Sequence, residues 1–458
     1  MTPEAEKYFD SLKETYASQR PKSEALHKKA CRYMSGGDTR TATFFLPFPN
    51  FIERGEGAYM YDADGHKLLD FQNNYTSLIH GHAHKETVEA VCQQMARGSA
   101  YTAPFEKQIE LSGLLAERFP GIDLLRFTNS GTEANMHALR IARAYTGKAK
   151  IIKTEGGYHG TTDVFEASVD PNIKKAGTLD SIKVIPESRG VSENALKDVL
   201  VAPFNDIERT AKIIEEHHHE TACMIIEPIM GSAGQITPKI EYLTFLREIT
   251  ERYNIVLIFD EVVTGRLTTG GAQKYYGVTP DITTLGKIIG GGTPVGAFGG
   301  KEEIMQMYDP RRKQIYLSGT FNGNAVTMAA GLATMKAFDE EKAAYVNKLG
   351  DRFRDGILGI YRRLGLNMQI SGAGSIYNTL FTDKPVSNYR DVAAAHEELN
   401  KILYMALLNK GVFNAERGMF CMSTAMTESD VDFGLDAVKS ALGDMLPVIA
   451  AEAPELIL

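Results

Sequence analysis

The chain has 458 residues, of which 43% are apolar and 24% charged, a balance that excludes disorder throughout and suits a globular protein of more than one domain. Its formal net charge of −8 argues against nucleic acid or an anionic membrane as a partner, because both favour a basic surface. The four cysteines are too widely spaced for a zinc site or a disulfide framework, and no apolar run reaches the roughly 18 residues of a membrane span, so we expect a cytoplasmic protein.

Residues 1 to about 34 predict one amphipathic helix, because apolar side chains recur at helical spacing among charged residues. The glycine pair at 36–37 ends this pattern, and Arg40 follows just before an aromatic-rich run. An arginine at this position has two explanations. It is a solvated surface charge, which residue preferences favour, or its planar guanidinium binds a substrate carboxylate through two parallel hydrogen bonds.

Residues 51–71 predict a β-hairpin whose turn is the Asp-Gly dipeptide at 64–65. Three histidines, His80, His82 and His84, alternate shortly afterwards. This spacing superficially suggests a metal site, but no cysteine or carboxylate completes a ligand set at a recognisable spacing. We therefore expect no metal site here.

A helix is predicted from about residue 106 to 119, followed by a short strand and a long helix. Ser130, Gly131 and Thr132 form the turn at the start of this long helix. Free backbone N–H groups and the positive end of the helix dipole favour a phosphate at such a turn. The alternative is an ordinary serine or threonine cap, which the residue types alone favour.

A further strand is predicted over about residues 148–154, and it leads to Tyr158 and His159. An aromatic ring at such a strand end either stacks on a flat ligand or packs half-buried. Residues 161–200 are polar and irregular, and the sequence assigns them no function. The next apolar run predicts a buried strand that ends on Glu227.

The stretch 255–292 carries the most informative chemistry. Its first residues, 255–259, predict a buried strand that delivers Asp260 at its carboxyl end, where open α/β sheets bind ligands. Lys287 comes later and runs into three glycines. Pyridoxal 5′-phosphate requires an amine that forms a Schiff base and an acid that keeps its pyridine nitrogen protonated, and this pair supplies both. Taken singly, a solvated lysine and a turn aspartate explain the two residues equally well.

Five motifs occur in one order along the chain. They are RFTNSGTEAN (126–135), GGYHG (156–160), FDEV (259–262), TTLGKIIGGG (283–292) and SGTFNGN (318–324). With them the chain resembles the class III aminotransferases, which are pyridoxal-phosphate enzymes of fold type I. The resemblance implies an α/β fold, with a large domain built on a mostly parallel seven-stranded sheet flanked by helices and a small α+β domain.

The same resemblance divides the chain into three parts. We expect residues 1–75 to form an N-terminal segment that joins the small domain. Residues 76–330 are expected to form the large domain that binds pyridoxal phosphate, and residues 331–458 the small α+β domain.

The resemblance also implies roles for individual residues. Lys287 would be the catalytic base and acid that carries the cofactor, and Asp260 the acid at the pyridine nitrogen. Thr320 matches a threonine that reaches the phosphate in the neighbouring subunit, which implies a homodimer with shared active sites. The expected cofactor-binding residues are Ser130, Gly131, Thr132, Tyr158, His159, Glu227, Asp260, Val262, Lys287 and Thr320.

Two branches of the family match these motifs: β-amino-acid aminotransferases of the β-phenylalanine type, and glutamate-1-semialdehyde aminomutases. The segments GGDTR, NNYTS and SGTFNGN are similar to the first branch. Aminomutases typically carry a tryptophan motif in place of NNYTS, and this chain has no tryptophan. The resemblance makes Arg40, Tyr75 and Arg417 the substrate-binding residues, with Arg40 for the substrate carboxylate and Arg417 for that of an α-keto acid.

We therefore expect a transaminase that moves an amino group from a β-amino acid to 2-oxoglutarate or pyruvate by a ping-pong mechanism. The main alternative is a glutamate-1-semialdehyde 2,1-aminomutase, followed by another class III amine or D-amino-acid transaminase. A protein that binds the cofactor without catalysis remains a third possibility. A nucleotide-binding loop is not expected, because GKIIGGG lacks the phosphate-loop spacing.

Overall fold

The computed structural model describes residues 1–458. Its centre is a seven-stranded sheet in which only β12 runs antiparallel to its neighbours. The strand order is β4 (Leu124–Thr128), β12 (Gly296–Gly300), β11 (Ile282–Gly286), β10 (Val256–Asp260), β9 (Thr221–Ile226), β5 (Lys150–Thr154) and β8 (Val199–Ala202). The mostly parallel seven-stranded sheet expected from the sequence is confirmed.

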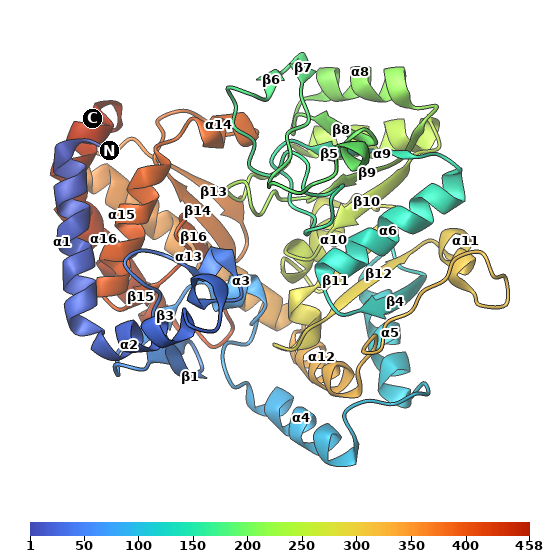
Figure 1. Ribbon diagram of the computed structural model, residues 1–458, viewed down its shortest axis with the longest axis horizontal. Helices are drawn as coiled ribbons and strands as arrows, with labels where there is room; N and C mark the ends of the chain where they lie inside the picture. The colour runs from blue at the N-terminus through green and yellow to red at the C-terminus, as the bar shows by residue number, and fades with distance from the viewer.

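The middle strands are buried on both faces, which explains their continuous apolar sequences. Every residue of β9 and β10 is buried. Successive side chains of β10 pack into different layers, Ile258 with α6 (Gly131–Thr146) and Phe259 with α9 (Ile240–Arg252). Figure 1 shows these helices around the sheet, with α8 (Ile207–His217) beside α9.

A group of helices closes the lower side of the large domain in Figure 1. It consists of α4 (Lys85–Arg97), α5 (Glu106–Arg118) and α12 (Ala325–Ala337), and α12 packs against the other two. The helix predicted from about 106 to 119 is confirmed as α5. The expected domain boundary after residue 330 falls inside α12, so we propose that the large domain extends to the end of this helix, near Phe338.

The C-terminal part forms a smaller α+β unit. Its helices are α13 (Glu340–Leu364), α14 (Tyr389–Ala393), α15 (Glu397–Asn409) and α16 (Glu428–Glu452), and its sheet has the order β13 (Gln369–Ala373), β14 (Ile376–Leu380) and β16 (Met419–Cys421). A second sheet joins β1 (Ile52–Glu56), β2 (Tyr59–Asp62) and β3 (Lys67–Asp70) to β15 (Val412–Phe413). The N-terminal residues therefore pack with the C-terminal unit, which supports our proposal that 1–75 joins the small domain.

The single N-terminal helix predicted over residues 1 to about 34 is wrong in extent. Two helices occur instead, α1 (Pro3–Gln19) and α2 (Pro21–Ala30). Proline disfavours helical geometry in the residue before it, and Arg20 accordingly leaves the helix, with φ −129° and ψ 52°. α1 packs against α15 and α16.

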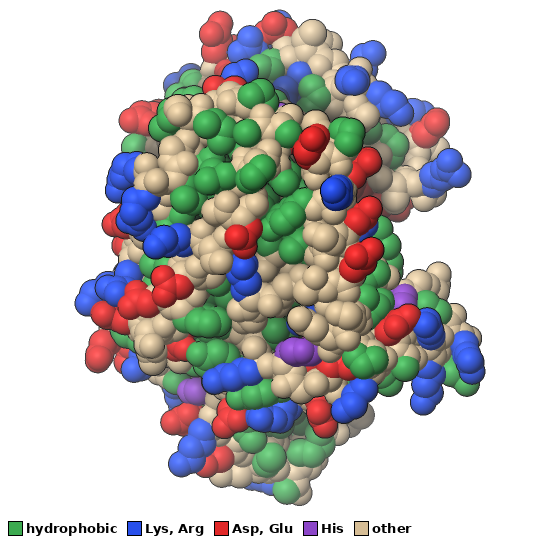
Figure 2. All heavy atoms as spheres, turned by 90° about the vertical axis from the view of Figure 1, so that its left-hand side faces the viewer, with side chains coloured by type: hydrophobic (Ala, Val, Ile, Leu, Met, Phe, Trp, Pro, Cys, Tyr) green, Lys and Arg blue, Asp and Glu red, His purple; other side chains and the backbone are tan.

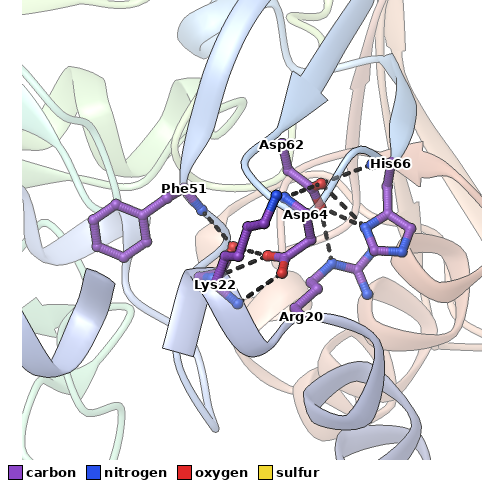
Figure 3. A network of polar contacts seen from close by, with 7 residues as sticks. Arg20, Lys22, Phe51, Asp62, Asp64 and His66 are labelled. Atoms are coloured by element: carbon purple, nitrogen blue, oxygen red, sulfur yellow. Dashed lines mark hydrogen bonds and ion pairs between the residues drawn. The ribbon is translucent and has the colours of Figure 1, made fainter. Parts of the chain in front are cut away.

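The break also directs the Arg20 side chain into the protein. Its Nε donates to Asp62 Oδ2 over 3.2 Å, and both side chains are buried. His66 completes the group, because its backbone N–H and its Nδ1 also contact Asp62. Figure 3 shows these side chains meeting at the turn between β2 and β3, which confirms the predicted hairpin around residues 64–65.

Residues 161–200 are mostly irregular, as predicted; they contain β6 (Gly177–Thr178), β7 (Ser181–Ile182) and α7 (Glu193–Leu196), and β8 begins at Val199. Short helices α10 (Gly271–Tyr276) and α11 (Glu302–Met305) complete the large domain. Figure 2 shows that acidic and basic side chains are interspersed on the face that carries α1. No helix combines the length and apolar character that crossing a membrane requires.

Candidate active site

The candidate residues follow the carboxyl ends of strands that run in the same direction in the central sheet. Residues 130–132 come after β4, Tyr158 after β5, Glu227 after β9, Asp260 at the end of β10 and Lys287 directly after β11. Parallel strands end at the same edge of a sheet, so the fold brings these segments together. This edge is where open α/β sheets bind their ligands.

Asp260 is held by hydrogen bonds from three directions. Its Oδ2 accepts from Asn135 Nδ2 at 2.7 Å and contacts His159 Nδ1 at 2.9 Å, while its Oδ1 accepts from the Val262 backbone N–H at 3.1 Å. The Asp260 side chain is only 5% exposed. Burial lowers the pKa of His159, although Asp260 acts in the opposite direction. The short contact lets the imidazole donate its Nδ1–H to the carboxyl group. The carboxylate thus has a fixed orientation.

Lys287 opens a short 3-10 turn, Lys287–Gly290, with a φ of +48°. Burial lowers the pKa of its ammonium group, the carboxylates of Asp260 and Glu227 act against this, and Arg417 reinforces it. A lowered pKa increases the neutral form, which is the nucleophilic and basic form of an amine. The Lys287 amine makes no hydrogen bond within the chain.

The start of α6 offers free donors. Ser130 is the N-cap, and its Oγ accepts from the Glu133 backbone N–H at 3.2 Å. The backbone N–H groups of Gly131 and Thr132 have no acceptor in the chain, as is usual in the first turn of a helix. The sequence left two interpretations of this turn open, a serine cap and an anion site. The structure is compatible with both, because the capping bond uses the Glu133 N–H and leaves those of Gly131 and Thr132 free.

Close packing around this turn leaves room for only small residues. A β-carbon at Gly160, whose φ is +101°, would lie 2.3 Å from Thr132 Oγ1. At Gly131 it would lie 3.0 Å from Val262 Cγ2. Val262 therefore lies beside the start of α6 and next to Asp260.

Tyr158 and Glu227 are joined through the backbone. Glu227 Oε1 accepts from the Tyr158 N–H at 2.9 Å, and its Oε2 accepts from the Gly231 N–H at 3.0 Å. Burial, together with the nearby Asp260, raises the pKa of Glu227 to about 7. The Tyr158 side chain is 42% exposed, so its ring remains accessible.

Arg40 and Arg417 both lie near Tyr75. Arg40 sits over the Tyr75 ring at 6.0 Å from its centroid. Burial raises the pKa of the Tyr75 hydroxyl, while the positive charges of Arg417 and Arg40 lower it. Neither guanidinium forms an ion pair with a carboxylate of the chain. The structure therefore brings together the three residues that the sequence assigned to substrate.

Thr320 differs from the other candidates because it lies in an exposed segment. Tyr316 and Phe321, on either side of it, are 81% and 58% exposed. Asn322 in the same segment accepts a hydrogen bond from Asn129 Nδ2 at 2.8 Å, which places the segment next to the start of α6.

Three polar residues near the site received no role from the sequence. Asn135 links Asp260 to Thr284 of β11, whose hydroxyl donates to Asn135 Oδ1 at 2.6 Å. Lys153 is fully buried and donates to the Gly157 carbonyl at 2.7 Å. Arg266 is also fully buried, and its Nε donates to Ser375 Oγ at 3.0 Å. The available signal was a charged or amide side chain inside an otherwise apolar strand or helix face.

The chain is similar to known proteins. The family described as Aminotransferase class-III matches residues 43–442. A glutamate-1-semialdehyde 2,1-aminomutase from Methanosphaera stadtmanae is 39% identical over 424 residues, which is 92% of this chain and 98% of that protein. The structure of an omega-transaminase from Sphaerobacter thermophilus has a TM-score of 0.88 and 41% identity, over 92% of this chain and 97% of that one. The structure of a beta-phenylalanine aminotransferase from Variovorax paradoxus has a TM-score of 0.88 and 35% identity, over 98% of this chain and 99% of that one.

The chain therefore belongs to the class III aminotransferases. It is an enzyme of fold type I that depends on pyridoxal 5′-phosphate. The residues at the strand ends fit this cofactor: free N–H groups suit its phosphate, the oriented Asp260 carboxylate its pyridine nitrogen, and the unpaired Lys287 amine its aldehyde.

Proposed function

We propose that the enzyme is a transaminase that moves an amino group from a β-amino acid to an α-keto acid, 2-oxoglutarate or pyruvate. The observation that carries this proposal is the pair of arginines around Tyr75, neither of which has a carboxylate partner in the chain. A guanidinium without an internal partner is suited to bind a ligand carboxylate. One arginine serves the carboxylate of each substrate, Arg40 that of the β-amino acid and Arg417 that of the keto acid.

The cofactor would be held by residues at five strand ends. Ser130, Gly131 and Thr132 would bind its phosphate, and Tyr158 and Val262 would contact opposite faces of its ring. His159 acts through Asp260, which it orients, and Glu227 through Tyr158, whose backbone it holds. When bound, pyridoxal phosphate supplies an electron sink for the carbon that carries the substrate amine.

Lys287 and Asp260 perform the proton chemistry. The neutral Lys287 Nζ would take the proton from the substrate carbon that bears the amine, and the resulting ammonium group would then deliver this proton to the C4′ carbon of the cofactor, its former aldehyde carbon. The Asp260 carboxyl group, oriented by Asn135, His159 and the Val262 backbone, would lie at the pyridine nitrogen of the cofactor and stabilise its protonated form. Arg40 fixes the substrate carboxylate and thereby presents the amine-bearing carbon to Lys287.

We propose that the enzyme is a homodimer with shared active sites. The exposed aromatic side chains of Tyr316 and Phe321 support this, because large apolar groups at the surface are typical of a subunit interface. Thr320 lies between them, where it would reach the cofactor phosphate of the partner subunit.

The second candidate function is glutamate-1-semialdehyde 2,1-aminomutase. Curated relatives at 39% and 41% identity carry that name, and this similarity favours it. Two product assays separate the candidates. In the first, the holoenzyme receives 3-amino-3-phenylpropanoate with 2-oxoglutarate or pyruvate, and glutamate or alanine is quantified. In the second, it receives glutamate 1-semialdehyde, and 5-aminolevulinate is quantified. Turnover only in the second assay would contradict our proposal.

A further inference from the structure

The segment that carries Tyr75 has a rare backbone conformation. Four consecutive residues of α3 (Asn73–Thr76) have positive φ values of 50°, 48°, 53° and 75°. None of them is glycine, so the segment is one turn of left-handed helix built from residues with side chains. Such a conformation costs roughly 1–2 kcal/mol per residue, and it persists only where surrounding contacts impose it.

The surrounding contacts come from both domains. Asp70 Oδ1 accepts from the Asn73 N–H at 2.9 Å, and Asn73 Nδ2 donates to the Cys421 carbonyl at 2.8 Å. At the other end of the turn, Arg266 Nη1 donates to the Thr76 carbonyl at 3.2 Å. Both ends of the turn are thus fixed by buried groups, which defines where the two central side chains, Asn74 and Tyr75, emerge.

Asn74 contacts the arginine proposed to bind substrate. Its Oδ1 accepts from Arg40 Nη1 at 2.9 Å, and its Nδ2 donates to Ser77 Oγ at 3.1 Å. The Ser77 hydroxyl already donates its proton to the backbone carbonyl of Asn74 at 2.9 Å. Ser77 Oγ can therefore only accept from the Asn74 side chain. This fixes the amide orientation, with its oxygen toward Arg40.

The Asn74 amide orders Arg40 without neutralising it. The other nitrogens of the Arg40 guanidinium have no acceptor in the chain. The nearby acid, Asp38, accepts instead from the backbone N–H of Thr39 at 2.6 Å and from that of Arg40 at 3.3 Å, and it forms no ion pair with the guanidinium. A neutral acceptor on one nitrogen leaves the full charge and an open edge for two parallel hydrogen bonds to a carboxylate.

We propose that Asn74 is a positioning residue that gives the enzyme its selectivity for donors with a carboxylate, by holding Arg40 from the left-handed turn. This inference rests on the proposed function of Arg40. An aspartate at position 74 would keep the shape but pair with Arg40 and compete with the substrate. A glycine would keep the left-handed backbone but remove the amide.

The test measures kcat and KM of the holoenzyme for 3-amino-3-phenylpropanoate, and the single-turnover rate with 1-phenylethylamine, which has the same skeleton without the carboxylate. For Asn74→Asp we expect KM to rise about 10-fold to 100-fold, the range of a charge-assisted hydrogen bond, with kcat within threefold of wild type. Asn74→Gly should raise KM about 10-fold and leave kcat unchanged. The rate with 1-phenylethylamine should change less than threefold in both variants. Asn194→Asp is the matched control, because this exposed asparagine also accepts from a cation, Lys197 at 2.8 Å.

Three results would overturn the inference. The first is a loss of kcat with KM unchanged. The second is an equal loss with both donors, which indicates a merely structural role. The third is wild-type KM in both variants. Arg40→Ala distinguishes the inference from the function on which it rests. If Arg40→Ala raises KM for the β-amino acid and the Asn74 variants do not, only the role of Asn74 fails. If the wild-type enzyme does not convert the β-amino acid, both proposals fail.

Discussion

Lys287 has the surroundings of a reactive amine. It lies half-buried directly after β11, its amine has no hydrogen-bond partner, and burial lowers its pKa. The carboxylates of Asp260 and Glu227 oppose this effect, so the amine keeps a proton more readily than an isolated buried lysine. An amine whose pKa is lowered can take up a proton as a base and release it as an acid within one reaction.

Replacing Lys287 by alanine tests this role. We expect Lys287→Ala to reduce turnover by about 100-fold to 10,000-fold, the usual contribution of a general acid and base. After borohydride reduction, peptide mass spectrometry should find the cofactor attached to Lys287 in the wild type and to no lysine in the variant. Lys274→Ala, at a lysine paired with Glu340 at the surface, is the control and should keep wild-type turnover.

Glu227 predicts a pH dependence of stability. Its pKa is raised from 4.5 to about 7 in the folded protein, so the folded state binds more protons than the unfolded state between these pH values. The stabilising contribution of Glu227 is complete below pH 4.5 and is lost as the pH rises to about 7, by up to about 3 kcal/mol. The difference in unfolding free energy between wild type and Glu227→Gln, measured by denaturant titration of the holoenzymes, should fall over this range. A difference independent of pH would be the contrary result.

Sequence reasoning located residues of the site where chemistry and strand ends coincide. Asp260 closes an apolar run and Lys287 precedes a row of glycines, so both stood out. Asn74 and Asn135 did not stand out, because their importance lies in partners that are distant in sequence, Arg40 and Asp260. Only the folded chain brings such partners together.

α14, in the small domain, contacts the large domain directly after β5, the strand that leads to Tyr158. Arg390 donates from Nε and Nη2 to the two carboxylate oxygens of Glu155, at 2.8 and 2.9 Å. The neighbouring Tyr389 hydroxyl donates to Asp170 Oδ1 at 2.6 Å, within the irregular segment 161–200. A short helix thus fixes both the end of β5 and the segment beside it.

Removing one partner of this buried pair should be costly. We expect Arg390→Ala to lower the free energy of unfolding by about 3–5 kcal/mol, because Glu155 would remain buried and unpaired. Arg352→Ala is the control: Arg352 forms an equally short contact with Asp432, 2.7 Å, but at the surface, where about 1 kcal/mol or less is expected. Equal losses in the two variants, measured by denaturant titration, would contradict the assignment of a buried connection.

The elements could be predicted where their signal is local. The buried strand β10, the hairpin around residues 64–65 and the helix α5 all follow from hydrophobic period or turn chemistry. The break at Pro21 was missed although its signal, a proline inside the predicted helix, is local. The left-handed turn of α3 was missed for a different reason: asparagine tolerates this geometry at single positions, but four consecutive residues adopt it only because buried contacts with Cys421 and Arg266 impose it.

At the scale of the whole molecule, the segment around Thr320 exposes large aromatic side chains that a single chain leaves mostly uncovered. Tyr316 is 81% exposed, a fraction typical of polar side chains rather than of a large aromatic one. A dimer would bury this surface and bring Thr320 to the partner's cofactor.

Tyr316→Glu should therefore weaken the dimer, because it places a charge in the proposed interface. Sedimentation velocity is expected to show a larger monomer fraction, and activity per chain should fall with dilution. Phe433→Glu alters another exposed aromatic residue, on α16, and should remain dimeric. Two variants that sediment alike would exclude this segment from the interface.

One half-reaction decides whether the enzyme acts on β-amino acids. Purified holoenzyme is mixed with 3-amino-3-phenylpropanoate in the absence of any keto acid, and the visible absorption of the cofactor is followed. We predict conversion to the pyridoxamine form, which requires the amino group to leave this donor. No change with this donor, together with conversion by 4,5-diaminovalerate, would contradict the proposed function and favour the aminomutase.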